Sequence, residues 1–185
     1  MEDIMYTLLY YSATGNTKHL AKELTTQLSI SKNDVFELDR TPYAKLEKKE
    51  HLILMYPIHG FNPPRTVKRY IKNMPKGLFD KVSLIAVGCN DLWLNNAVSV
   101  NLRKYFTKAG TTIKVDGIIP MPITFVMGMK EDMKKDIVEK AIISIQNLSN
   151  DILDDKTKYR KVQLASRMIH QVGKMEDFAA RFFGL

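Results

Sequence analysis

The sequence predicts an α/β fold built on a doubly wound, five-stranded parallel sheet, with an extra C-terminal helix. Five short apolar runs, typical of strands covered on both faces, alternate strictly with segments of helical periodicity. Glycine or proline occurs in several of the turns between these segments. Such a strand–helix succession requires right-handed crossovers, which place helices on both faces of a parallel sheet.

The first strand is predicted at residues 7–11, an almost wholly apolar run that breaks into the polar turn 12–17. A helix follows, in which leucines recur every four residues along one stripe: Leu20, Leu24 and Leu28. Residues 35–38 predict a second, shorter strand.

The third strand is predicted at residues 51–56 and stops at Pro57. Pro64 suits the first turn of the next helix because proline lacks the N–H that this position leaves unused. The inward stripe of that helix would be Val67, Tyr70, Ile71 and Met74.

The last two strands are predicted at residues 81–87 and 112–119. Between them a helix runs from about residue 95 to Lys108, and Gly110 stops it. The fifth strand is closed by Pro120, Met121 and Pro122, and the final helix of the sheet carries Met133, Ile137, Ala141, Ile145 and Leu148.

The domain is predicted to end near Ser149, so residues 1–149 form one unit and residues 150–185 a polar linker and a basic amphipathic helix. Residues 156–185 carry seven Lys or Arg against two acidic residues, so this tail holds much of the chain's net charge of +8. We expect the tail helix to fold back and close a sheet edge or face. A homodimer contact, or a surface for acidic redox partners or anionic lipid, is the alternative.

Composition indicates an ordinary globular domain, with 45% hydrophobic and 26% charged residues. No apolar run approaches the roughly 18 residues of a membrane span, and the N-terminus lacks a signal-peptide pattern. The single cysteine, Cys89, excludes an intramolecular disulfide and a cysteine-held iron–sulfur cluster within this chain. These observations predict a cytoplasmic protein with no transmembrane segment.

Polar turns follow the first, third and fourth strands, and ligands of open parallel sheets bind outside the carboxyl ends of strands. In the first turn the hydroxyl and amide donors are those of Ser12, Thr14, Asn16 and Thr17, and Gly15 permits tight turning. Free N–H groups there lead into a helix, whose dipole favours an anion. Because the turn holds no lysine, it is not a Walker loop. The alternative is an ordinary capped helix start.

Residues 11–17, YSATGNT, resemble the phosphate loop of flavodoxins, Ser/Thr-x-Thr-Gly-Asn-Thr, at all six core positions. Residues 55–64 and 120–122 resemble more closely the flavodoxin domain of EFR1-type flavodoxin–ferredoxin proteins, although the ferredoxin half is missing here. The resemblance covers roughly residues 5–148. It implies the strand order 2-1-3-4-5 and a non-covalent FMN cofactor, with its phosphate on Ser12, Ala13, Thr14, Gly15, Asn16 and Thr17.

The resemblance also implies that the turn after the third strand lies along the isoalloxazine ring of FMN. Its residues are Pro57, Ile58, His59, Gly60, Phe61 and Asn62. The peptide of Gly60 would turn its carbonyl to N5–H of the reduced flavin, and His59 and Phe61 would wall the ring. His59 could instead be a surface histidine without a role, and Phe61 could pack into the core.

The turn after the fourth strand would contact the pyrimidine edge of FMN through backbone N–H groups. Its residues are Gly88, Asn90, Asp91 and Trp93. Trp93, the only tryptophan, would cover the ring, unless it is a half-buried packing residue. Asp91 would cap the following helix or repel the flavin N1 anion. Cys89 is expected to be a small, buried hydrophobic residue.

A flavodoxin-like electron-transfer protein is the function that these residues favour, because the cofactor supplies the redox chemistry and no catalytic side chain is needed. Its partner would be a reductase or an iron–sulfur protein, and the basic charge leaves an acidic partner open. An FMN-dependent reductase of a quinone or other small acceptor is the nearer alternative. A flavin-free binding module is the second, and the absence of interleaved aromatics argues against nucleic acid. The four histidines show no metal-ligand spacing.

Overall fold

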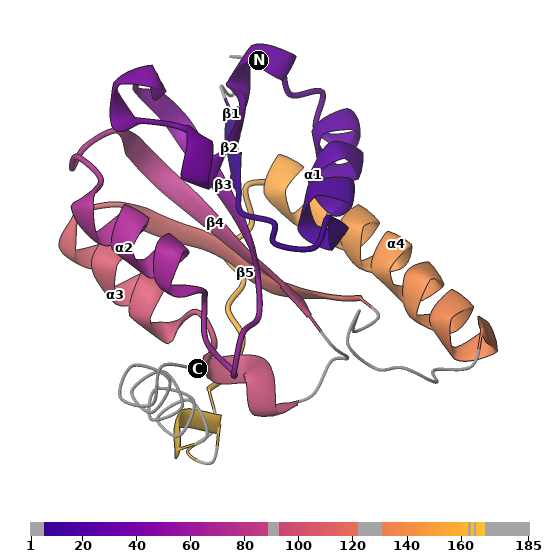
Figure 1. Ribbon diagram of the computed structural model, residues 1–185. Coiled ribbons are helices and arrows are strands. Elements are labelled where there is room, and N and C mark those ends of the chain that lie inside the picture. The colour runs from indigo at the N-terminus through magenta and orange to yellow at the C-terminus, as the bar shows by residue number, and fades with distance from the viewer. Residues whose placement is uncertain (1–5, 89–92, 122–130, 163, 165, 169–185) are drawn as a thin grey trace.

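A computed structural model describes residues 6–88, 93–121, 131–162, 164 and 166–168 of the protein. Its centre is a five-stranded sheet in the order β2-β1-β3-β4-β5 (Figure 1). Every pair of neighbouring strands is parallel. The strands are β1 (Tyr6–Tyr10), β2 (Val35–Glu37), β3 (Lys49–Pro57), β4 (Phe79–Gly88) and β5 (Thr112–Pro120). The predicted sheet and its strand order are therefore confirmed.

Helices cover both faces of this sheet, as the alternation predicts (Figure 1). α1 (Asn16–Gln27) and α4 (Glu131–Leu153) lie on one face, and α2 (Arg65–Asn73) and α3 (Val100–Lys108) on the other. Two separate apolar clusters fill the layers between helices and sheet. Most residues of the predicted inward stripes are buried or partly buried in them: Leu20, Leu24, Leu28, Val67, Tyr70, Ile71, Met74, Ala141, Ile145 and Leu148. Ile137 belongs to neither cluster of described residues, and the side chain of Met133 is not described.

The prediction that strands and helices alternate strictly is wrong between β2 and β3. Two 3-10 turns, η2 (Leu38–Arg40) and η3 (Tyr43–Lys45), make that connection in place of an α-helix. Thr41-Pro42 stands between them, and a residue that precedes proline is disfavoured in the α region, so a continuous helix cannot form. The helix expected from about residue 95 likewise starts as the 3-10 turn η4 (Trp93–Ala97), and α3 begins only at Val100.

The expected linker at residues 150–158 is helical at its start, because α4 continues to Leu153. Ile152 packs into the apolar layer shared by α1 and α4, which extends the helix beyond the predicted end at residue 149. The chain then runs beside the free edge of β5. Lys158 donates its backbone N–H to the carbonyl of Lys114 (2.8 Å) and accepts from the N–H of Asp116 (3.0 Å).

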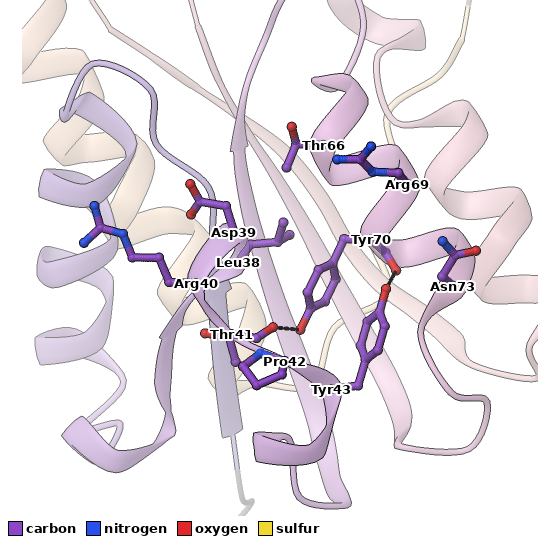
Figure 2. A pocket seen from close by; sticks show the side chains of 10 residues that line it. All are labelled: Leu38, Asp39, Arg40, Thr41, Pro42, Tyr43, Thr66, Arg69, Tyr70 and Asn73. Carbon is purple, nitrogen blue, oxygen red and sulfur yellow. Dashed lines mark hydrogen bonds between the residues drawn. The ribbon is translucent and has the colours of Figure 1, made fainter.

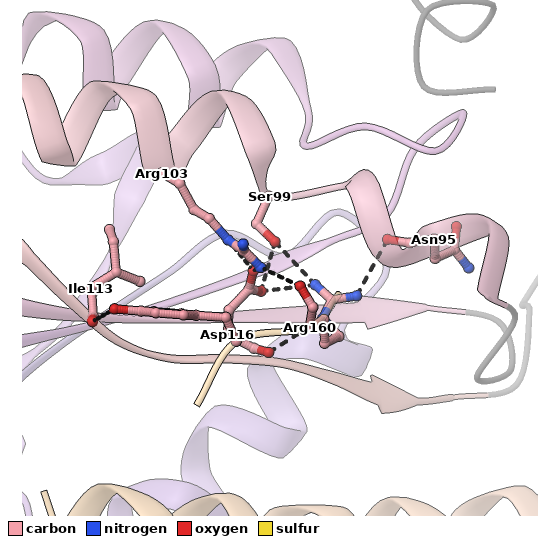
Figure 3. A network of polar contacts seen from close by, with 7 residues as sticks. Asn95, Ser99, Arg103, Ile113, Asp116 and Arg160 are labelled. Carbon is pink, nitrogen blue, oxygen red and sulfur yellow. Dashed lines mark hydrogen bonds and ion pairs between the residues drawn. The ribbon is translucent and has the colours of Figure 1, made fainter. Parts of the chain in front are cut away.

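A buried carboxylate fastens this C-terminal segment to the sheet (Figure 3). The side chain of Asp116 in β5 has no exposed surface and forms ion pairs with Arg103 of α3 and Arg160 of the C-terminal segment. Ser99 donates its hydroxyl to the same carboxylate at 2.6 Å, and Arg160 reaches it at 2.8 Å. The segment that closes the sheet edge is therefore residues 158–160. Of the predicted tail helix, which would begin at Val162, five residues are described: Val162 is not helical, and Leu164, Ser166, Arg167 and Met168 are.

None of the helices in the described parts of the chain is long and apolar enough to cross a membrane.

Candidate functional site at the carboxyl edge of the sheet

β1, β3 and β4 end at one edge of the sheet because all three strands point the same way. Tyr10 at the end of β1 lies beside Met55 of β3. Pro57 at the end of β3 lies beside Val87 of β4, and Gly88 beside Pro120 of β5. The structure thus brings the three strand ends that precede the predicted turns to the edge where open parallel sheets bind ligands.

In the turn after β1, two backbone N–H groups point at the same oxygen atom, that of the Ser12 hydroxyl. The Ser12 hydroxyl oxygen accepts hydrogen bonds from the N–H of Gly15 (3.1 Å) and from the N–H of Lys18 (3.2 Å). Gly15 is left-handed (φ 95°), a conformation that glycine adopts without strain, and α1 begins at the next residue. The first turn of α1 holds no acidic side chain. An oxygen acceptor therefore already fits these N–H groups, at a helix end that favours negative charge.

The exposure of this turn suits contact with a ligand. Ala13, Thr14 and Gly15 are exposed, and Ser12 and Asn16 are half-buried. Thr17 is buried at 2% exposure, so its side chain belongs to the protein interior in this structure.

The turn after β3 is a tight two-residue loop. His59 and Asn62 exchange two backbone hydrogen bonds, of 2.8 and 2.9 Å, across Gly60 and Phe61. Both central residues have positive φ, 49° at Gly60 and 60° at Phe61, which is the pattern of a type I′ turn. The Asn62 amide is 2% exposed and donates from Nδ2 to the carbonyl of Gly60 at 2.9 Å. Glycine at the first central position also permits the type II′ turn, in which the second residue returns to negative φ.

The turns after β3 and β4 approach each other closely at Ile58 and Gly88. Ile58 donates its backbone N–H to the carbonyl of Val87 at 2.8 Å. A Cβ on Gly88 would lie 2.9 Å from Cδ1 of Ile58, so only glycine leaves room for this side chain. The Gly88 carbonyl accepts from the N–H of Met121 at 3.0 Å, which ties the end of β4 to the end of β5.

Several predicted site residues fall outside what the structure describes. Asn90, Asp91 and Cys89 lie in the undescribed range 89–92, and the side chain of Trp93 is not described either. Pro57 is the last residue of β3 and is half-buried, whereas His59 and Gly60 are exposed and Phe61 is half-buried. Among the described residues, no group of three or more His, Cys, Asp or Glu could hold a metal ion.

Sequence reasoning missed a groove between the η2–η3 connection and α2 (Figure 2). Its volume is about 530 Å³, and none of the predicted site residues lines it. Tyr43 and Tyr70 form part of its wall, with ring centroids 4.6 Å apart. Each hydroxyl is bound to a backbone carbonyl, Tyr43 to Tyr70 and Tyr70 to Thr41, both at 2.8 Å. No pattern in the sequence predicts this groove, because its two walls come from separate segments, residues 38–43 and 66–73, that are brought together only by folding.

Sequence reasoning also missed the partners of Asp116, although an acidic residue inside an apolar strand is itself a signal of a buried ion pair. Burial raises the pKa of the neighbouring Tyr56, and the negative charge of Asp116 raises it further, so the Tyr56 hydroxyl stays neutral. These groups lie within the protein interior and support the fold.

No family model matches this sequence, and no curated protein does. Solved structures resemble the fold over most of the chain. A short-chain flavodoxin associated with a non-canonical PDU bacterial microcompartment has a TM-score of 0.55 at 15% identity, covering 81% of this chain and 97% of that one. Flavodoxin 1 from Bacillus cereus has a TM-score of 0.54 at 13% identity, covering 80% and 97%. A flavodoxin from Streptococcus pneumonia has a TM-score of 0.52 at 14% identity, with the same coverage. The strand order, the layers of helices and these likenesses together establish that this chain has the flavodoxin-like fold.

Proposed function

We propose that this protein binds FMN without a covalent bond and transfers electrons between protein partners in the cytoplasm. One observation carries the proposal: the turn after β1 aims the N–H groups of Gly15 and Lys18 at one oxygen acceptor, at the start of α1. A phosphate oxygen is an acceptor of the same kind, and the helix dipole favours its charge. When bound, FMN supplies one- and two-electron redox chemistry.

In this proposal the turn after β1 holds the phosphate of FMN through neutral donors. Its residues are Ser12, Ala13, Thr14, Gly15, Asn16 and Thr17. The Ser12 hydroxyl would exchange its present bonds for one to the phosphate and release the N–H groups of Gly15 and Lys18 to the same ligand. The fit rests on the convergence of these donors and on the left-handed Gly15.

The turns after β3 and β4 would hold the ring. Pro57, Ile58, His59, Gly60, Phe61 and Asn62 would line one side, and Gly88, Asn90, Asp91 and Trp93 the other. The close packing of Ile58 on Gly88 fixes the two turns relative to each other at their bases. At Gly60 the carbonyl is held by the Asn62 amide, and turning that peptide toward the ring edge would exchange this bond for one to N5–H.

The proposal is tested by reconstituting the purified protein with FMN. We expect stoichiometric uptake, quenched flavin fluorescence and a visible spectrum that differs from that of free FMN. Failure to bind FMN at micromolar concentration would refute the proposal. Steady-state turnover of NAD(P)H with a small quinone would instead indicate a reductase, whereas electron exchange with an iron–sulfur protein alone indicates a carrier.

A further inference from the structure

The outward side of α2 and α3 carries cations and no acidic residue. α2 has the sequence RTVKRYIKN, with four cations, and α3 has VNLRKYFTK, with three. On the opposite face of the sheet, α4 carries five acidic residues and three lysines. The exposed cations of the α2–α3 face are Arg65, Arg69, Lys72, Lys104 and Lys108. The positive charge of the domain is therefore concentrated on one face.

The fold explains only part of this charge. Arg103 pairs with the buried Asp116, but Arg69, Lys72, Lys104 and Lys108 form no ion pair with any residue that the structure describes. Like charges four residues apart on one helix, such as Lys104 and Lys108, weaken it by about 0.2–0.5 kcal/mol per pair. Cations in the first turn of α2 also oppose the helix dipole, whereas Lys72 and Lys108, in the last turns of α2 and α3, are favoured by it. These local costs favour a role outside the chain.

The basic face adjoins the candidate site. α2 begins at Arg65, shortly after the turn of Gly60 and Phe61, so the N-terminal end of this face lies nearest the site. Lys72 and Lys108 stand at the C-terminal ends of α2 and α3, which lead toward the starts of β4 and β5 at the opposite edge of the sheet. The groove of about 530 Å³ lies beside α2, and residues of α2 form one of its walls. Arg69 from α2 and Arg40 from η2 stand on opposite sides of it, with Asp39 also in its lining (Figure 2).

We propose that the α2–α3 face docks an acidic surface of the protein that exchanges electrons with the chain. This inference rests on the proposed FMN function, because electron transfer requires the partner to come close to the turns that would hold the ring. Complementary charge steers such encounters and raises their rate. A protein is favoured over nucleic acid because the proposed electron transfer needs a redox-active partner, which nucleic acid does not supply.

The test compares two double variants with the same change in net charge. Arg69→Glu with Lys104→Glu reverses charge on the proposed docking face. Lys22→Glu with Lys135→Glu, in exposed positions on α1 and α4, is the matched control on the opposite face. The probe is a reduced acidic [4Fe–4S] ferredoxin mixed with the FMN-loaded protein, and stopped-flow absorbance gives the second-order rate.

At low ionic strength we expect the docking-face variant to react about tenfold more slowly or worse, and the control to stay within about twofold of the unmodified protein. The difference should shrink sharply at about 1 M salt, where the screening length is about 3 Å. Equal rates in the two variants would overturn the docking face. Tighter binding of duplex DNA than of the ferredoxin would overturn the assignment to a protein partner.

A second measurement does not need the flavin. The apo-protein is titrated with an oligoglutamate peptide and followed by amide NMR shifts, which we expect to fall on α2 and α3. Shifts spread evenly over α1 and α4 would overturn the docking face. If the chain takes up no FMN, the proposed function fails, and the peptide map alone then decides whether this face binds acidic protein.

Discussion

Gly15 offers the sharpest test of the phosphate turn, because a Cβ there would meet nothing within 4 Å and only the backbone would resist it. The residue has φ 95°, and an L-residue in the left-handed region costs about 1–2 kcal/mol. The turn is exposed, so in the apo-protein an alanine can relax out of this conformation. FMN binding would then require the strained form. We expect Gly15→Ala to weaken FMN affinity about 5–30-fold, the equivalent of 1–2 kcal/mol.

Gly110 supplies the matched control, since it has φ 84° and equally open space around a built Cβ, but lies at the end of α3. Gly110→Ala should lower the free energy of unfolding by about 1–2 kcal/mol and leave FMN affinity unchanged. Fluorescence titration with FMN and urea denaturation of the apo-proteins measure the two quantities. Unchanged FMN affinity in Gly15→Ala, or an equal loss in Gly110→Ala, would refute the assignment of the phosphate turn.

Three further outcomes are expected. Arg160→Ala should lower the free energy of unfolding by about 3 kcal/mol in urea denaturation, because it removes one of the two cations that neutralise a fully buried carboxylate. Lys140→Ala, at an exposed pair, should lower it by less than about 1 kcal/mol, and equal losses would contradict the argument. Burial lowers the pKa of His51 from 6.5 to about 4, so the unfolded chain binds the extra proton first as the pH falls. Stability should therefore drop by about 3 kcal/mol between pH 6.5 and pH 4 and stay flatter in His51→Gln, and parallel curves in urea would refute this. Asn62→Ala should release the Gly60 carbonyl and raise the one-electron midpoint potential of bound FMN by about 40 mV, the equivalent of one hydrogen bond of about 1 kcal/mol. An unchanged potential would exclude a role for that bond.

The position of the charge shows how sequence and structure complement each other. The seven cations at residues 156–185 are visible as a run, and they attract attention to the tail. The five exposed cations of α2 and α3 are separated in sequence by all of β4 and become one surface only when the two helices pack side by side (Figure 1). A count of charges along the sequence therefore does not reveal that the cations of α2 and α3 form one basic surface.

The turn after β3 shows a similar limit. The sequence Gly60-Phe61 is typical of a type II′ turn, with glycine first and an ordinary residue second. The structure holds the type I′ form, with Phe61 at φ 60° and the Asn62 amide bonded to the Gly60 carbonyl. Turn preference is a local property, whereas this choice depends on a buried side chain that the tertiary fold places over the turn.

The five strands, the inward stripes of the helices and the glycine turn at the start of α1 can be predicted from the sequence. These features follow from apolar periodicity and backbone sterics, which act between residues close together in the chain. The extension of α4 to Leu153, the edge contact at Lys158 and the pairing of Asp116 with Arg160 depend on the folded protein. They arise from burial, because an apolar face or a charged group withdrawn from water needs a partner, and the fold can bring that partner from any distance along the chain.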